Sequence, residues 1–171
     1  MNPTSAAPAI IDFEASGFGR GSYPIEVGFT LPDGHSFCSL IRPEPEWVAW
    51  DRAAERVHGI SRDMLLQHGR PVEDIVLLMN ERLRGLTVYS DGWAYDFVWL
   101  NLMFDAAHRV PSFRLEHLAR LLGEGEASRW NGVRNEVERE LGLSRHRASN
   151  DARVLQATWR RLHDASLPNA A

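Results

Sequence analysis

Apolar residues near the start of the chain come in short runs that end at turn-forming residues. The segments 9–14, 24–31 and 35–41 are rich in β-branched and aromatic residues, which is typical of strands. Pro, Asp and Gly at 32–34 form a tight turn between the second segment and the third. The front of the chain therefore predicts an antiparallel meander of three strands.

Beyond this meander, apolar positions recur mainly at helical spacing. The expected elements are short helices near 49–57 and 61–68, the second capped by Ser61, a helix from Pro71, a strand at 85–90, helices at 95–108, 115–122 and 127–141, and a last helix with the apolar stripe Ala152, Leu155, Trp159 and Leu162. Strands followed by helices that alternate with at least one more strand predict an α/β layer fold.

The composition is that of one soluble globular domain. The chain has 171 residues, of which 44% are hydrophobic and 25% charged. The domain is expected at 9–165, between loose ends at 1–8 and 166–171. No apolar run approaches the roughly 20 residues of a membrane helix, and the first residues do not resemble a signal peptide. Because Cys38 is the single cysteine, an intrachain disulfide is excluded, and a cytoplasmic protein is expected.

The charge of the chain does not indicate a basic surface that would bind long nucleic acid. The formal net charge is −4, whereas such binding surfaces are strongly basic. All 19 basic residues are arginine. Arginine binds phosphate through two hydrogen bonds, so the bias could serve phosphate binding. A GC-rich genome that favours arginine codons explains the same bias. The arginines are scattered along the chain, which agrees with the second explanation.

Two acids, Asp12 and Glu14, stand inside the apolar run of the first predicted strand. Side chains alternate along a strand, so both carboxylates point to one face and Ile11 and Phe13 to the other. Neighbouring carboxylates repel each other unless a cation lies between them, and a divalent metal meets that need. A strand that reaches the surface would also explain the pair.

Three further polar residues, Asp96, His146 and Asp151, lie at or just before the start of a predicted helix. Asp96 lies near the start of the helix at 95–108, and Asp151 follows His146 by five residues where the last helix begins. Each acid on its own is explained by the helix dipole, which favours negative charge in the first turn, and His146 on its own is explained as a loop histidine.

Taken together and in this order, these residues resemble the three motifs of the DEDDh exonucleases, the DnaQ-like branch of the ribonuclease H-like superfamily. The motif-like segments are 12–17 (DFEASG), 95–100 (YDFVWL) and 146–152 (HRASNDA), with further similarity at 24–28 (PIEVG) and 57–61 (VHGIS). The family includes the proofreading subunit of bacterial DNA polymerase, ribonuclease T and oligoribonuclease. The resemblance implies a single ribonuclease H-like domain, with a five-stranded mixed sheet flanked by helices.

The resemblance also implies a chemistry. Asp12, Glu14, Asp96 and Asp151 would hold two Mg²⁺ or Mn²⁺ ions about 4 Å apart, since hard oxygen ligands suit these cations. His146 would be the general base that takes a proton from the attacking water. Two divalent cations would also cancel the formal charge of −4, so that the loaded site attracts phosphate.

The residues expected to contact the terminal nucleotide are Ser16, Gly17 and Phe18. Ser16 offers a hydroxyl and a backbone N–H, and Phe18 is either an apolar wedge against the last base or a residue packed under the loop. Asp91 and Gly92 stand where the family usually has His-Asn. The pair is interpreted either as a turn after the strand or as an extra acid near the metals. The contacts that the family makes from this segment to the terminal nucleotide are therefore not assigned to this chain. Glu26 is interpreted as structural.

The expected function is a metal-dependent 3′→5′ exonuclease that acts on single-stranded or short nucleic acid and releases nucleoside 5′-monophosphates. One alternative is a nucleic-acid-binding or scaffold protein with little turnover on the same fold, for which the Asp91–Gly92 departure is the support. Another is an unrelated phosphohydrolase that acts on small phosphoesters. The choice between DNA and RNA stays open, because no residue can be assigned to the 2′-hydroxyl. The resemblance allows a homodimer, but no stretch identifies an interface.

Overall fold

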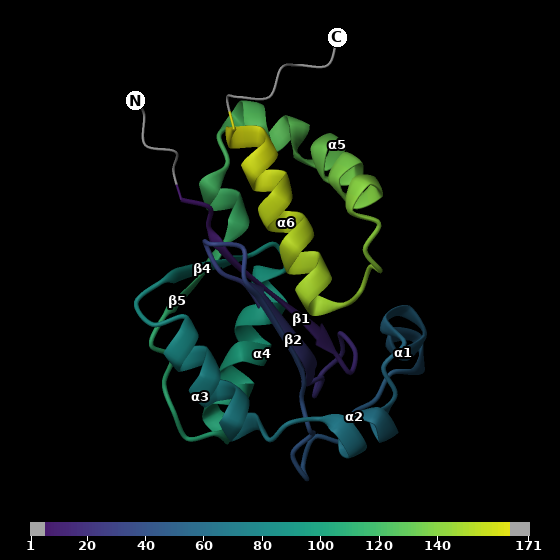
Figure 1. The fold of residues 1–171 in the computed structure, drawn as a ribbon. Helices are drawn as coiled ribbons and strands as arrows, with labels where there is room; N and C mark the ends of the chain where they lie inside the picture. Colours follow the sequence, from purple (N-terminus) through teal and green to yellow (C-terminus); the bar gives the residue numbers. More distant parts are fainter. Residues whose placement is uncertain (1–5, 165–171) are drawn as a thin grey trace.

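The computed structural model describes residues 6–164, which form five strands, six α-helices and one short 3-10 helix. In chain order these are β1 (Ala9–Ala15), β2 (Pro24–Thr30), β3 (Ser36–Leu40), α1 (Arg52–His58), α2 (Arg62–His68), α3 (Val72–Arg82), β4 (Thr87–Ser90), α4 (Trp93–Ala106), β5 (Arg114–His117), the 3-10 helix (Leu118–Leu121), α5 (Glu124–Leu141) and α6 (Ala148–His163). Figure 1 shows their arrangement around the sheet.

The sheet is mixed and has the strand order β3-β2-β1-β4-β5. β1 pairs antiparallel with β2, and β2 pairs antiparallel with β3, which confirms the meander. β4 lies parallel to β1, and β5 lies parallel to β4. Parallel neighbours need a crossover, and α4 supplies it between β4 and β5.

One predicted helix is wrong. The segment 115–122 has apolar residues at helical spacing, but the structure divides it between β5 and the 3-10 helix. Val88 and Leu115 are register partners, as are Ser90 and His117. Pairing with the open edge of β4 therefore outweighs the local helical pattern, as tertiary context often does for short segments.

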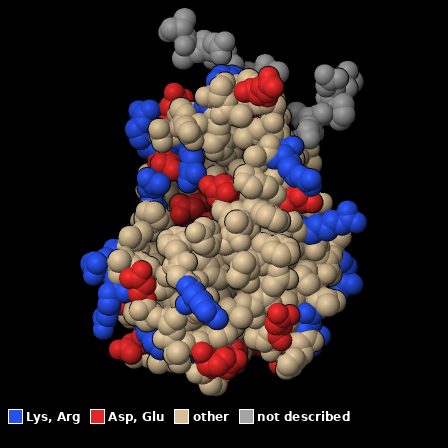
Figure 2. Space-filling model, turned by 180° about the vertical axis from the view of Figure 1, so that it is seen from behind, with Lys and Arg blue, Asp and Glu red and all other residues tan. Residues whose placement is uncertain are grey.

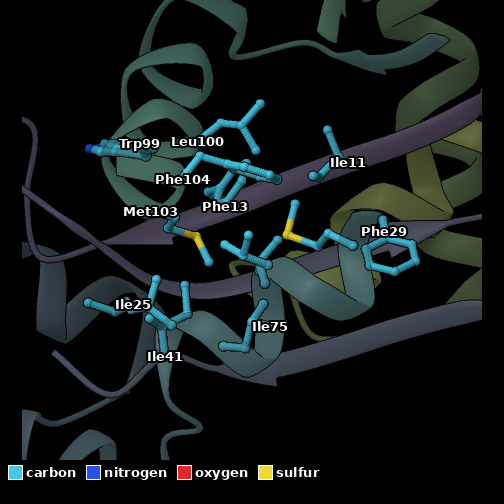
Figure 3. Packing of buried hydrophobic residues seen from close by; sticks show 14 of the residues in the cluster. Ile11, Phe13, Ile25, Phe29, Ile41, Ile75, Trp99, Leu100, Met103 and Phe104 are labelled. Atoms are coloured by element: carbon cyan, nitrogen blue, oxygen red, sulfur yellow. The ribbon is translucent and has the colours of Figure 1, made fainter. Parts of the chain in front are cut away.

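Two hydrophobic cores lie on opposite faces of the sheet. Ile11 and Phe13 belong to the larger core, which includes residues of α3 and α4 and is shown in Figure 3. Ile10 belongs to the smaller core, together with Trp130 of α5 and residues of α6. The stripe predicted for the last helix contributes Ala152, Leu155 and Trp159 to this core, with Leu162 packed against it. The expected alternation along β1 is confirmed: its odd-numbered residues belong to the core with α3 and α4, Ile10 belongs to the core with α6, and Asp12 and Glu14 belong to neither core.

The packed part of the chain begins before residue 9. Ala7 and Pro8 are buried, and the side-chain amide of Gln156 donates to the Pro8 carbonyl at 2.9 Å. The remainder of the expected loose ends, at 1–5 and 166–171, lies outside the described residues. Within residues 6–164, no helix combines the length and the apolar character needed to cross a membrane.

Candidate active site

All five residues predicted for catalysis line one cleft of about 420 Å³. We call it the acidic cleft, and the five residues are Asp12, Glu14, Asp96, His146 and Asp151; Asp51 and His58 line it as well. These five residues come from the end of β1, the first turn of α4 and the start of α6 with the loop before it, and α1 forms a further wall of the cleft. A larger hollow of about 560 Å³ is lined by Asn80, Asp105, His108 and Arg109, among others, and it gathers a single carboxylate.

Asp96 is held from two sides at the start of α4. The hydroxyl of Ser90, the last residue of β4, donates a hydrogen bond to Asp96 Oδ2. The backbone of Gly92 packs closely on the same carboxylate, since a Cβ at residue 92 would lie 3.3 Å from Asp96 Oδ2. Ser90 was not predicted as a site residue, because a serine that ends a strand carries no chemical signal in the sequence.

His146 and Asp151 are held together by the backbone. The His146 N–H donates to Asp151 Oδ2 at 3.0 Å, and His146 has a φ of 59°, which is uncommon for a residue with a side chain. One ligand atom from each of Glu14, His146 and Asp151 can lie within 4.8 Å of the other two. The structure thus gathers residues from β1, the α5–α6 loop and α6 at one point.

Burial and mutual repulsion make these carboxyl groups hard to ionise. Burial raises the pKa of Glu14 from 4.5 to about 8, and neighbouring carboxylates, Asp151 first among them, add to the rise. Burial likewise raises the pKa of Asp96 to about 7, against the lowering effect of the Ser90 hydrogen bond. The pKa of Asp12 lies well above its usual range because of burial, followed by repulsion from Asp96 and Glu14. The fold therefore assembles carboxyl groups without supplying enough positive charge to keep them ionised.

This donor set fits divalent metal ions. Clustered carboxylate oxygens are ligands that Mg²⁺ and Mn²⁺ prefer, and an imidazole nitrogen beside them is also accepted by Mn²⁺ and Zn²⁺. A cation between Glu14, Asp12 and Asp151 would favour their ionised forms, which burial disfavours. The unbalanced charge of the cluster is thus the structural observation that points to metal.

One wall of the cleft is apolar and aromatic. Phe18, Val57, Tyr95 and Trp99 line it, and Phe18 is 70% exposed. The Phe18 ring meets Tyr95 edge-on, with centroids 5.2 Å apart, and Tyr95 stacks on Trp99 at 5.7 Å. Phe18 is therefore not packed under the loop. Tyr95 and Trp99 are four residues apart and therefore share a face of α4, next to Asp96. Their position could have been inferred from the sequence.

Ser16 is 1% exposed and belongs to the closed loop after β1, and its contact with the terminal nucleotide stays a prediction. The Ser16 hydroxyl accepts a hydrogen bond from the Tyr23 N–H at 3.1 Å, and the Ser16 N–H donates to the Tyr23 carbonyl at 2.9 Å. Both groups thus close the loop after β1 and do not face the cleft. Gly17 packs against Asp51, since a Cβ at residue 17 would lie 2.9 Å from Asp51 Cβ, and a contact from Gly17 to substrate stays a prediction.

Asp91 and Gly92 form a bend after β4, and Asp91 is also an acid close to the cleft. Its carboxylate pairs with Arg134 of α5 at 2.9 Å, and its charge adds to the rise in the pKa of Asp12 and Asp96. Asp91 is therefore both part of a turn after the strand and an extra acid near the cleft, as the two interpretations from the sequence have it. On the face drawn in Figure 2, the basic side chains of the described residues are dispersed among acidic ones and form no continuous track.

The five-stranded mixed sheet with helices on both faces has the ribonuclease H-like fold seen in exonuclease I, which confirms the predicted fold class. Solved structures of similar fold include exonucleases. A zinc-bound complex of Escherichia coli exonuclease I with single-stranded DNA has a TM-score of 0.67 at 11% identity, over 91% of this chain and 40% of that one. A second exonuclease I structure has a TM-score of 0.67 at 12% identity, over 94% and 42%.

The exonuclease I from Methylocaldum szegediense is also similar, with a TM-score of 0.58 at 13% identity, over 72% of this chain and 29% of that one. No protein-family model matches the chain, and no curated protein matches it in sequence. The chain spans less than half the length of these exonucleases. At such identities the likeness shows the fold, and the activity has to be argued from the cleft itself.

Proposed function

We propose that the chain is a metal-dependent 3′→5′ exonuclease of the DEDDh type. The observation that carries this proposal is the convergence of Asp12, Glu14, Asp96, His146 and Asp151 in one cleft from three parts of the fold. The fold supports it, because exonucleases are among the structural neighbours with this architecture.

In this proposal the acidic side chains hold the metals and His146 moves the proton. Asp12, Glu14, Asp96 and Asp151 would bind two Mg²⁺ or Mn²⁺ ions, which when bound supply activation of the attacking water and charge stabilisation of the departing 3′ oxygen. His146 would accept the water's proton as general base. Ser90 and Gly92 would fix the orientation of Asp96, through the hydrogen bond and the packing described above.

The proposed substrate is a single-stranded or short nucleic acid whose last base packs on the aromatic wall of the cleft. Stacking on aromatic side chains binds single strands with little dependence on sequence, and Phe18 and Tyr95 offer exposed ring surface beside the acids. Exonuclease I has been captured in complex with single-stranded oligonucleotides, which supports this class of ligand. The product would be a nucleoside 5′-monophosphate.

The test uses 5′-labelled single-stranded DNA and RNA oligonucleotides incubated with Mn²⁺, Mg²⁺ or EDTA and resolved on a sequencing gel. We expect a metal-dependent ladder that shortens from the 3′ end. The variant Asp12→Asn should abolish the ladder while its circular dichroism spectrum stays native. The control variant Asp74→Asn changes an exposed acid of α3 and should retain full activity.

Three other results would each contradict the proposal. Binding of oligonucleotides without shortening would favour the scaffold alternative, and hydrolysis of aryl phosphates without action on oligonucleotides would favour a small-molecule phosphohydrolase. Equal activity of wild type and Asp12→Asn would show that the reaction takes place elsewhere. The homodimer stays a prediction, which sedimentation of the wild-type protein tests independently.

A further inference from the structure

Glu26 is a fully buried carboxylate on β2, with an exposed fraction of 0%. In the β1–β2 register it lies directly opposite Glu14. A buried carboxylate is costly unless it is paired and hydrogen-bonded, so its partners reveal what the fold gains from it.

The partners of Glu26 come from the far end of the chain, at the junction of the α5–α6 loop with α6. Arg147 Nη2 lies 2.6 Å from Glu26 Oε1, and Arg147 Nε lies 3.0 Å from Oε1 and 3.2 Å from Oε2. The Ala148 N–H donates to Oε2 at 2.8 Å. The planar guanidinium and the carboxylate thus form a two-pronged pair, which fixes orientation as well as distance.

A second contact makes this junction rigid. A Cβ at Gly28 would lie 2.1 Å from the Ser149 backbone nitrogen, so the first turn of α6 rests directly on the backbone of β2. Glu26 and Gly28 are two residues apart on the strand and therefore share a face. The start of α6 is consequently held by one ionic and one steric contact with the same strand.

His146 directly precedes Arg147, and its left-handed backbone conformation is one that a free loop seldom keeps. The hydrogen bond from its N–H to Asp151 ties it to α6, and the Asn150 side-chain amide donates to the Ser144 carbonyl at 2.9 Å. Both bonds join the loop to α6, and neither limits the freedom of the loop relative to the sheet. Anchoring the next residue to β2 removes that freedom and directs the imidazole toward Glu14, which is the cross-strand neighbour of Glu26.

We propose that Glu26 and Arg147 are positioning residues for His146: their ion pair anchors the α5–α6 loop to β2 and holds the imidazole over the acidic cleft. This inference rests on the proposed function for the role of His146, whereas the anchoring itself is a property of the loop. Loss of the pair should lower kcat and leave KM nearly unchanged, because a misplaced base affects the transition state more than binding.

The other side of His146 offers a matched control. Arg145 also pairs with a glutamate, but its side chain is 60% exposed and lies 4.0 Å from Glu138. An exposed ion pair at this distance contributes little. Arg145→Met therefore removes the same charge from the same loop without removing an anchor.

The experiment compares wild type, Arg145→Met, Arg147→Lys and the double variant Glu26→Gln/Arg147→Met. The double variant removes the pair without leaving a buried charge, so the fold is retained. On a single-stranded oligonucleotide with Mn²⁺ we expect kcat of the double variant to fall roughly 10- to 100-fold. Arg147→Lys keeps the positive charge but loses the planar guanidinium that forms the two-pronged pair. Its kcat should therefore lie between that of wild type and that of the double variant. Arg145→Met should match wild type.

Two further readouts separate positioning from general stability. In a His146→Ala background, the double variant should cause less than a twofold further loss, because residues that act through one group are not additive. Hydrogen exchange followed by mass spectrometry should show faster exchange over residues 143–149 in the double variant, with the β1 peptide unchanged. A full further loss without His146 would overturn the positioning role, and unchanged exchange over 143–149 would overturn the anchoring. A wild-type protein without nuclease activity would instead refute the proposed function, and the exchange result alone would then decide the anchoring.

Discussion

Replacing Glu14 by glutamine should stabilise the metal-free protein, and the gain should grow as the pH rises. Glutamine resembles the protonated form of Glu14, whose pKa burial raises from 4.5 to about 8 in the folded protein. The folded state therefore resists ionisation of this group, whereas the unfolded chain ionises freely. Wild type loses stability as the pH rises from about 4.5 to about 8, and the Glu14→Gln variant avoids that loss.

The magnitude follows from the shift in pKa. Each pKa unit corresponds to about 1.4 kcal/mol, so the rise to about 8 sets a ceiling of about 5 kcal/mol above pH 9. Part of this cost is already present at pH 5, where the unfolded group is largely ionised. Between pH 5 and pH 9, the advantage of Glu14→Gln in free energy of unfolding should therefore grow by at most about 4 kcal/mol.

The assay is urea unfolding of both proteins in EDTA at pH 5, 7 and 9, with the free energy taken from the midpoint and the slope. The control Glu81→Gln changes an exposed acid of α3 and should give the same difference from wild type at every pH. Saturating Mn²⁺ should reverse the order at pH 8, because a bound cation stabilises wild type and the variant lacks one ligand. A Glu14→Gln difference that does not change with pH would refute the electrostatic account of the cleft.

Three more predictions follow from the packing and the aromatic wall. Tyr95→Ala should raise KM for single-stranded oligonucleotides about tenfold, as expected for the loss of one stacked base, whereas Phe97→Ala, an exposed aromatic of the same helix outside the cleft, should leave KM unchanged. Gly28→Ala should destabilise the protein by about 3 kcal/mol in urea unfolding, because its Cβ would collide with backbone at Ser149, and an unchanged midpoint would contradict the close contact. Ile75→Ala should cost about 3 kcal/mol for the cavity left in the larger core, with a loss below 1 kcal/mol speaking against its full burial.

Local periodicity predicts that Asp12 and Glu14 share a face, whereas Asp96, His146 and Asp151 enter the predicted site only through the resemblance to the DEDDh motifs. The two-residue repeat of a strand places Asp12 and Glu14 on one face, and the structure confirms that Ile11 and Phe13 face the opposite core. The apolar stripe of α6 is likewise a local pattern, and it packs as expected. Such features depend on neighbours within a few residues, which the sequence displays directly.

The features that could not be predicted depend on contacts between distant segments. Glu26 and Arg147 are separated by 121 residues, and neither residue type by itself announces a partner. The Ser16 hydroxyl is taken up by Tyr23 across the loop after β1, a contact that only the folded loop reveals. The segment 115–122 has a helical pattern, and its strand exists because the edge of β4 is available to pair with it.

The most direct test of the account is the action of the wild-type protein, with Mn²⁺, on one single-stranded sequence in linear and in circular form. An exonuclease that works from the 3′ end in the acidic cleft should convert the linear strand to nucleoside 5′-monophosphates, identified by liquid chromatography, and should leave the circle intact. Cutting of the circle, or release of nucleoside 3′-monophosphates from the linear strand, would contradict it.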